Sequence, residues 1–223
     1  MFSLVNLILA GALIWLACKY FDLKKSLNPT EKRYSDLVDA LASVVDRVEG
    51  YDKSHAKEVT SLAVQIAQKT TMSSEQLLSL ETAAKLHDVG MLMVINDNIR
   101  SRRKLSDDDS FLMRNHPLLA EHYLKQEVAV TDDIPTIIRW HHERWDGFGY
   151  PDSLSGEQIP LPARILAIAD AVSSMRNSRS YRKRSYKTDK EIADELKRQS
   201  GLQFDPYLVK ITISILEENQ PLS

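Results

Sequence analysis

The sequence predicts an all-α protein, a helical bundle preceded by one apolar N-terminal helix. Apolar residues recur at helical spacing over most of residues 28–223, and no alternating run long enough for a strand occurs there. Residues 2–18 are apolar apart from two polar side chains. A chain of 223 residues suits one ordinary domain with a short appendage. We therefore expect an N-terminal segment at residues 1–27 and a single helical domain at residues 28–223.

The N-terminal segment reads FSLVNLILAGALIWLAC at residues 2–18 and carries no charge. A helix of that length rises about 26 Å, just enough to cross the hydrocarbon core of a membrane. Lys19, Lys24 and Lys25 follow directly, and the positive-inside rule then places the rest of the chain in the cytoplasm. We expect a retained single-pass anchor with the domain on the cytoplasmic side.

Three other interpretations of this segment are weaker. A cleaved signal peptide would begin with basic residues, which residues 1–4 lack. A lipoprotein site at Cys18 would need a different approach sequence than Trp15-Leu16-Ala17. A buried helix of a soluble fold is disfavoured because the terminal segment is apolar on all sides.

The helices of the domain are predicted from apolar spacing and from capping signals. Residues 88–106 and 146–161 are predicted to be non-helical connections, and loops that long in a compact domain tend to be functional. The helix signals are Pro29 after Asn28 with a stop at Gly50, the apolar stripe from Ala56 to Ile66, the start near Ser73 with a run through Leu86, the capping boxes Ser106–Asp109 and Thr188–Glu191, and Asp205-Pro206 before the last helix.

Composition excludes several classes of function. The single cysteine, Cys18, excludes an internal disulfide framework and any multi-cysteine zinc or iron–sulfur site. A net charge of -2 argues against a partner that is a DNA or RNA duplex, because such binders normally carry a basic excess.

The histidines indicate a metal site. His87-Asp88 and His141-His142 are adjacent pairs at the ends of apolar helical segments. A lone histidine at a helix end is usually structural or solvated, but buried imidazoles and carboxylates in pairs need partners, which a shared divalent ion supplies. The candidate ligands outnumber what one tetrahedral ion needs, and this excess predicts two ions bridged by a carboxylate such as Asp88. The candidate ligands are His55, His87, Asp88, His116, His141, His142 and Asp170.

The run HHERWDGFGYP at residues 141–151 resembles the signature of the HD-GYP family, a bacterial branch of the HD phosphohydrolases. HDVG at residues 87–90 resembles its HD motif, and ARILAIAD, SRSYRK and FDP resemble its downstream landmarks in the same order. The resemblance implies a helical bundle around a two- or three-metal centre, with all seven candidates as ligands and His87 and Asp88 as the catalytic pair. It also implies that the anchor lies in a bacterial inner membrane.

The resemblance bears on the number and kind of metal ions. Some members bind a third ion through a glutamate four residues before the first histidine, and here that position is Tyr51. Two divalent ions are therefore expected. Iron and manganese are the leading candidates, since nitrogen- and oxygen-rich sites accept both. His122 lies in no comparable context and is expected at the surface.

The implied substrate is cyclic di-GMP, hydrolysed to the linear dinucleotide pGpG and in some members on to GMP. Arg179 and Arg182 resemble positions that contact its phosphates, and arginine suits this task because its planar fork forms two parallel hydrogen bonds. Gly149, Tyr150 and Pro151 of the GYP run are expected to approach the ligand. For part of the basic stretch at residues 176–187, a solvated face is the alternative.

Two positions depart from the family pattern. Met91 stands where the HD motif usually continues to a lysine, and Ser173 stands where an aspartate is common. We hypothesise that both changed because they formed one charge pair near the metals. Their loss favours an alternative function, a catalytically weak receptor that binds metal, with or without nucleotide. A third alternative, hydrolysis of another nucleotide, fits the intact GYP signature less well.

Two partner predictions complete the analysis. A homodimer could form through the small residues Ala10, Gly11 and Ala12 in the membrane or through the amphipathic stretch 34–48, although that stretch is more simply explained by packing on its own domain. A signalling protein could bind the GYP loop.

Overall fold

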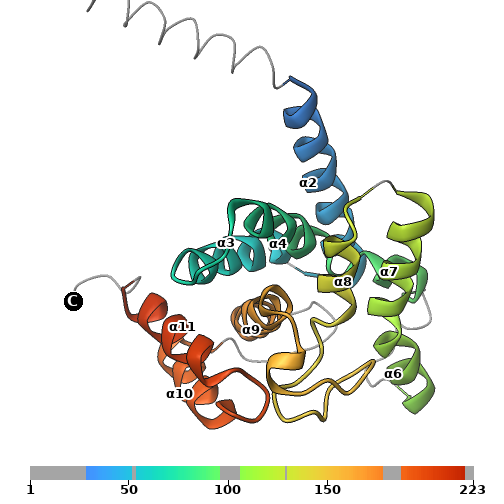
Figure 1. Cartoon of the computed structure of the whole chain (residues 1–223). Coiled ribbons are helices and arrows are strands. Elements are labelled where there is room, and N and C mark those ends of the chain that lie inside the picture. Colours follow the sequence, from blue (N-terminus) through green and yellow to red (C-terminus); the bar gives the residue numbers. More distant parts are fainter. Residues whose placement is uncertain (1–28, 52–53, 96–105, 129, 178–186, 219–223) are drawn as a thin grey trace, which may run out of the picture. The chain divides into compact units, whose positions relative to one another are not determined.

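The computed structural model describes residues 29–51, 54–95, 106–128, 130–177 and 187–218 (Figure 1). Every regular element in these ranges is helical, and the one β-bridge there joins Ser200 to Phe204 outside any strand. The all-α prediction is confirmed. The chain divides into two units, residues 1–39 and residues 40–223, and the helices discussed below belong to the second unit unless stated.

Most predicted helix boundaries are confirmed. The capping boxes at Ser106–Asp109 and Thr188–Glu191 both form, as does one at Ser73. The α-helices are α2 (Pro29–Glu49), α3 (His55–Gln68), α4 (Ser74–Leu86), α6 (Asp107–Arg114), α7 (His116–Glu127), α8 (Asp133–Arg139), α9 (Leu161–Arg176), α10 (Asp189–Gln199) and α11 (Pro206–Glu218), and the 3₁₀ turns are η1 (Val89–Met93) and η2 (Gly156–Gln158).

The prediction of non-helical connections is wrong at two places, η1 within residues 88–106 and η2 within residues 146–161. In η1, Val89, Gly90 and Met91 are buried, whereas Leu92 and Met93 of the same apolar run are exposed. A Cβ atom at Gly90 would lie only 2.1 Å from the carbonyl oxygen of His116. The glycine therefore lets η1 pack directly against the start of α7.

Helix α9 forms the centre of the 40–223 unit. It contacts α3, α4, α8, α10 and α11, and Figure 1 shows it with helices around it. Ile165, Leu166 and Ile168 are fully buried along it. A helix that is apolar on nearly all sides carries its polar residues into the core. Asp170 and Ser173 lie on this helix and therefore need partners there.

The predicted N-terminal anchor, including its boundary at residue 27, lies outside the described residues. Within the part of the chain that the structure describes, no helix is both long and apolar enough to cross a membrane.

Candidate metal centre

Four helix ends bring imidazoles together. His55 is the first residue of α3 and His116 the first of α7. His87 directly follows α4, and His141 follows α8 by two residues. All four are buried. Because each histidine lies at or just after a helix end, its side chain extends into the space where the ends of these helices meet.

The start of α3 is fixed by α2. Asp46 accepts hydrogen bonds from the backbone N–H of Ala56 at 3.2 and 3.3 Å. This carboxylate satisfies a donor of the first turn that Ser54, the residue at the N-cap, does not reach with its side chain. Burial raises the pKa of Asp46, and the Ala56 N–H opposes that rise. The cap sets the position of His55.

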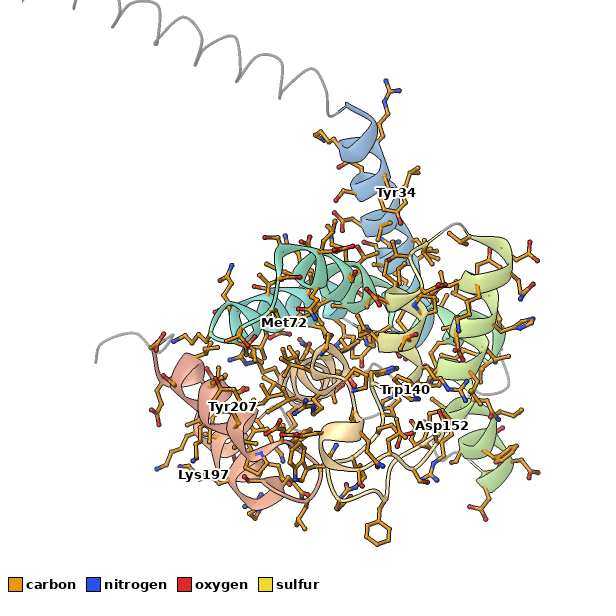
Figure 2. The ribbon with its side chains drawn as sticks, in the orientation of Figure 1. Tyr34, Met72, Trp140, Asp152, Lys197 and Tyr207 are labelled. Carbon is orange, nitrogen blue, oxygen red and sulfur yellow. The ribbon has the colours of Figure 1, made fainter. Side chains whose placement is uncertain are left out.

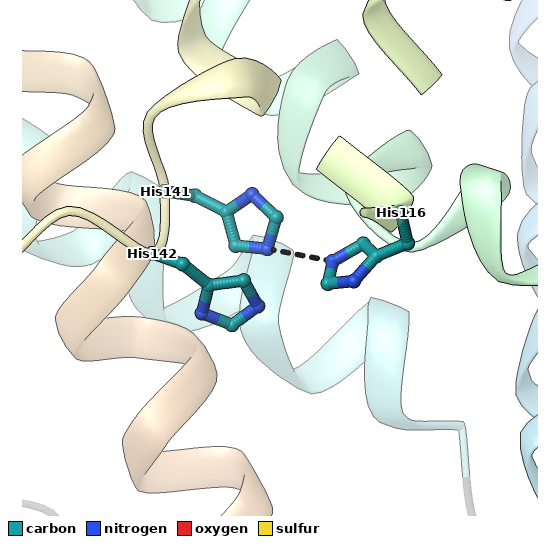
Figure 3. A group of neighbouring side chains, drawn as sticks. All are labelled: His116, His141 and His142. Carbon is teal, nitrogen blue, oxygen red and sulfur yellow. Dashed lines mark hydrogen bonds between the residues drawn. The ribbon is translucent and has the colours of Figure 1, made fainter. Parts of the chain in front are cut away.

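The candidate ligands form two groups of three, which we call trio A and trio B. Trio A is His55, His87 and Asp170, and trio B is His116, His141 and His142. Within each trio, one ligand atom from each residue lies within 4.8 Å of the others. Figure 3 shows trio B, in which the Nε2 atoms of His116 and His141 are 3.4 Å apart.

Asp88 lies between the two trios. Its Oδ2 is 3.1 Å from His87 Nε2 and 4.0 Å from His55 Nε2, both in trio A. Its Oδ1 is 3.2 Å from His116 Nε2 in trio B. One carboxylate therefore presents one oxygen to each trio, which is the arrangement of a bridging ligand.

Hydrogen bonds at Nδ1 orient the imidazoles. His87, His116 and His141 each lie 2.6 to 2.8 Å from the carbonyl oxygen of the residue three positions earlier. A carbonyl can only accept, so each Nδ1 must carry the proton and donate it. In the neutral ring Nε2 then has a free lone pair, and in all three residues Nε2 points to the centre of the cluster.

The pKa shifts agree with a site built for cations. Burial, followed by repulsion from His116, lowers the pKa of His142 to about 3, and burial likewise lowers that of His141. Burial opposes the charge on His87, but the Asp88 carboxylate outweighs it and raises the pKa of His87 to about 10. Burial also opposes the charge on Asp170, and His55 outweighs it to lower the Asp170 pKa. His141 and His142 are thus neutral near pH 7, the form in which an imidazole binds metal, whereas His87 carries a proton that metal binding would displace.

The residues fit a metal. The Nε2 atoms of His55 and His87 are buried and form no hydrogen bond with the residues described. In trio B, two imidazole nitrogens face each other at 3.4 Å. Two nitrogens bound to one ion at about 2.1 Å are separated by roughly 3.0 to 3.4 Å. An ion in trio A would give the Nε2 atoms of His55 and His87 a partner. An ion in trio B would remove the lone-pair repulsion between the Nε2 atoms of His116 and His141.

A cavity of about 210 Å³ opens over this cluster. Its polar groups include the carboxylates of Asp88 and Asp170 and the guanidinium of Arg114. The lining residues are Glu49, Asp88, Met91, Met113, Arg114, His116, His142, Tyr150 and Asp170.

The GYP loop covers one side of trio B. The ring of Tyr150 stacks on the ring of His142 with centroids 4.9 Å apart. The backbone N–H of Tyr150 donates to the carbonyl oxygen of His142 at 3.3 Å. A Cβ atom at Gly149 would lie 2.4 Å from Arg144 N, so this glycine is required by contact within the loop itself. The peptide bond between Tyr150 and Pro151 is cis. Of the expected substrate contacts Gly149, Tyr150 and Pro151, Tyr150 is the one that lines the cavity.

Charged side chains secure the far end of this loop. Asp152 accepts hydrogen bonds from Arg139 Nε and Trp140 Nε1, both at 2.7 Å (Figure 2). The Arg139 hydrogen bond lowers the pKa of Asp152 to about 2. Buried Glu143 accepts from the N–H of Asp152 at 2.6 Å and of Leu154 at 3.1 Å. The loop is thus tied to Arg139 at the end of α8 and to residues 140–143, which include the two histidines.

Glu49 and Arg114 lie near the cluster and were not singled out from the sequence, whereas Tyr51 was noted there only as the position of a glutamate in some family members. Glu49 is fully buried and lines the cavity. Arg114 lies over the Tyr150 ring at 5.4 Å and forms no ion pair with any residue that the structure describes. The Tyr51 ring stacks on His55 with centroids 4.1 Å apart. Arg114 had one signal in the sequence, its position two residues before a candidate ligand.

The two departures have different surroundings. Met91 is buried and lines the cavity. Ser173 is fully buried and forms hydrogen bonds with His55 and Glu58. Arg179 and Arg182 lie outside the described residues. His122 is exposed, as expected.

Comparison with known proteins identifies the fold and family. The sequence profile of the HD domain matches residues 37–208. The chain belongs to the HD-domain family. Its HHERWDGFGYP run places this HD domain in the HD-GYP branch. The solved structure of a cyclic GMP-AMP-specific phosphodiesterase of Vibrio cholerae, V-cGAP3, superposes with a TM-score of 0.66 at 21% identity, over 83% of this chain and 49% of that one.

Two curated relatives illustrate the activities found among similar proteins. The cyclic di-GMP phosphodiesterase response regulator RpfG of Xanthomonas campestris is 32% identical over 84% of this chain and 49% of its own length. The 3'3'-cGAMP-specific phosphodiesterase 2 of Vibrio cholerae is 29% identical over 92% of this chain and 38% of its own length. The HD-domain chain thus spans half or less of the length of these two relatives.

Proposed function

We propose that this HD-GYP domain hydrolyses a cyclic dinucleotide, cyclic di-GMP in the first instance, with two divalent metal ions. The single observation that carries the proposal is the placement of Asp88 between two complete trios. When bound, the ions supply a water nucleophile of lowered pKa and positive charge against the phosphate. Iron or manganese suits the nitrogen and oxygen donors.

The chain's own residues hold and orient this centre. Trio A and trio B would each hold one ion, and Asp88 would contribute one oxygen to each. Backbone carbonyls fix the rings of His87, His116 and His141, so their Nε2 atoms face the ions with little reorganisation. His87 and Asp88, the expected catalytic pair, act as ligands in this proposal.

The cavity suits a phosphodiester group. Its volume of about 210 Å³ is below the roughly 300–1,000 Å³ of pockets that enclose a small ligand, so it would admit the scissile phosphate and its neighbouring atoms. Arg114 supplies a guanidinium there, where Met91 supplies none. We assign to Arg114 the phosphate contact that the Met91 position lacks. Arg179 and Arg182 remain proposed contacts, as do Gly149, Tyr150 and Pro151.

The carboxylates of the cavity make nucleotide binding depend on metal. Glu49, Asp88 and Asp170 line the same space as Arg114. Without bound cations, these carboxylates would repel a phosphate more than one guanidinium attracts it. A metal-free chain is therefore expected to bind no cyclic dinucleotide.

We also propose that residues 1–27 anchor the domain at residues 28–223 to a bacterial inner membrane, on its cytoplasmic side, from the apolar run and the lysines after it. A homodimer is supported by one face of α2. Tyr34, labelled in Figure 2, and Leu37, Leu41 and Val44 are exposed at spacings of three and four residues, as in the seam of a coiled coil. A signalling partner could bind the GYP loop at Phe148, which is 85% exposed.

The alternative function is a metal-dependent receptor with weak hydrolysis, which Met91 favours because an apolar side chain replaces a phosphate-facing cation in the cavity. The test uses the full-length chain, purified without oxygen and loaded with iron or manganese. Cyclic di-GMP and 3'3'-cGAMP are incubated with it, and linear products are separated by chromatography. We expect pGpG from cyclic di-GMP, and none from the doubly substituted His87→Ala, Asp88→Ala chain. A chain shown to hold two ions that binds cyclic di-GMP without cleaving it would establish the receptor instead.

A further inference from the structure

His55 is oriented differently from three other imidazoles of the cluster, those of His87, His116 and His141. His87, His116 and His141 direct Nδ1 to backbone carbonyls, whereas His55 Nδ1 lies 2.9 Å from the hydroxyl of Ser173 on α9. His55 begins its helix, so no preceding turn of α3 offers it a carbonyl. A hydroxyl can donate or accept. By itself, Ser173 would leave open which nitrogen of His55 carries the proton.

Glu58 decides the direction of this hydrogen bond. The Ser173 hydroxyl donates its one proton to Glu58 Oε2 at 2.9 Å, and an ionised carboxylate can only accept. The Ser173 oxygen therefore has only lone pairs left for His55, and His55 Nδ1 must donate. Asn177 Nδ2 also donates to this oxygen at 3.2 Å.

The Glu58 carboxylate is held in turn by the end of α9. Arg176 Nη1 donates to Oε1 at 3.3 Å, and Asn177 Nδ2 donates to Oε2. Arg176 is itself fixed by Asp189 at 2.8 Å. Both oxygens of the Glu58 carboxylate thus accept hydrogen bonds. Because the two oxygens are chemically equivalent, a rotation of the carboxylate would leave this pattern unchanged.

We propose that Glu58 is a positioning residue that acts through Ser173 to place the proton on Nδ1 of His55, so that Nε2 is free to bind the ion of trio A. The proposal rests on the metal-binding part of the proposed function. Ser173, a departure from the family pattern, is then a working part of the site. The backbone carbonyls perform the same task for the other three rings.

The first test is spectroscopic and needs no metal. Long-range ¹H–¹⁵N NMR of the metal-free full-length chain reports which ring nitrogen of His55 is protonated, and His55→Ala identifies the signal. We expect protonated Nδ1 in the wild type. Glu58→Ala removes the acceptor of the Ser173 hydroxyl, so the hydroxyl is free to donate to Nδ1 of His55. The proton of His55 should then move to Nε2, which lies 3.3 Å from Asp170 Oδ1. An unchanged His55 tautomer in Glu58→Ala would overturn the proposal.

The second test counts ions. The chain, loaded with Mn²⁺, is titrated with a chelator, and bound metal per chain is measured. We expect Ser173→Ala and Glu58→Ala each to weaken the binding of one of the two ions about 10- to 100-fold and to leave the binding of the other unchanged. If Glu58 acts through Ser173, adding Glu58→Ala to Ser173→Ala changes nothing further. Additive effects, or equal loss of both ions, would show a general structural role.

Glu195→Ala is the matched control, because Glu195 is also a part-buried glutamate, paired with Lys187 on another part of the surface. It should leave the His55 tautomer and the binding of both ions as in the wild type. The two tests separate this inference from the proposed hydrolysis. A chain with the expected tautomers and two ions but no product would contradict only the hydrolysis. A chain that hydrolyses normally with an unchanged tautomer in Glu58→Ala would contradict only the inference.

Discussion

The two trios of the metal centre reach similar geometry by different means. In trio B, the rings of His116 and His141 are oriented by main-chain carbonyls, and the ring of His142 is covered by Tyr150. In trio A, His87 uses a carbonyl as well, but His55 depends on side chains from α3 and α9. A main-chain acceptor persists through any substitution that preserves the helix. Trio A is therefore the part of the centre that side-chain substitutions can adjust.

The largest expected effect comes from the ligand that both trios share. Asp88→Asn replaces a charged bridge with a neutral amide, so both ions should bind weakly and hydrolysis should fall by about a thousandfold or more. Metal analysis and product chromatography would measure this. Asp108→Asn, at an exposed site in α6, is the control. If the Asp88→Asn chain kept both ions tightly bound, the bridging role would be wrong.

Arg114 tests whether phosphate binding can be separated from metal binding. Arg114→Ala should lower kcat/KM for cyclic di-GMP by about a hundredfold, the usual cost of one charged contact to a reacting phosphate, and leave two ions per chain. Arg198→Ala, which removes an exposed arginine from α10, should change neither quantity. Loss of metal in Arg114→Ala would mean that this side chain supports trio B instead.

Gly149 tests how far trio B depends on the GYP loop. The new Cβ of Gly149→Ala would meet main-chain atoms of residues 143 and 144, so the loop must shift. We expect a loss of about 1 to 3 kcal/mol in unfolding free energy, with weaker metal binding in trio B than in trio A. Gly156→Ala, where no atom lies within 4 Å of the new Cβ, should cost less despite its positive φ of 55°. Equal costs would refute the packing argument.

The smallest effect concerns pH. The pKa of Asp152 is lowered to about 2 by Arg139, whereas an unfolded chain titrates near about 3.9. Its contribution to stability is therefore complete above roughly pH 4 and is lost as pH falls towards 2. Asp152→Asn should be less stable than the wild type in urea unfolding at pH 6, and the two should converge near pH 2. A constant difference across that range would point to another cause.

The sequence predicted which candidate ligands lie together better than it predicted the residues that support them. His141-His142 and His87-Asp88 stand out because adjacent metal-binding residue types at the ends of apolar segments are rare. Glu58 looks like an ordinary solvent-facing residue three positions after His55, and its role depends on how α9 packs against α3. The 3₁₀ turn after Asp88 was missed because a short apolar run has no period of its own. The position of Arg114 beside the cavity could not be predicted, because it depends on the direction of the side chain, which sequence spacing alone does not fix.

The seven candidate ligands come from places far apart in the chain, since His55 and Asp170 flank most of the domain between them. A bound ion that joins such residues ties remote segments together as a cross-link does, and its binding free energy adds to the stability of the fold. A chain without ions would open more often, and cellular proteases degrade proteins according to how often they open. In a metal-starved cell, the supply of metal would then set how many copies of this protein survive, in addition to how fast each one works.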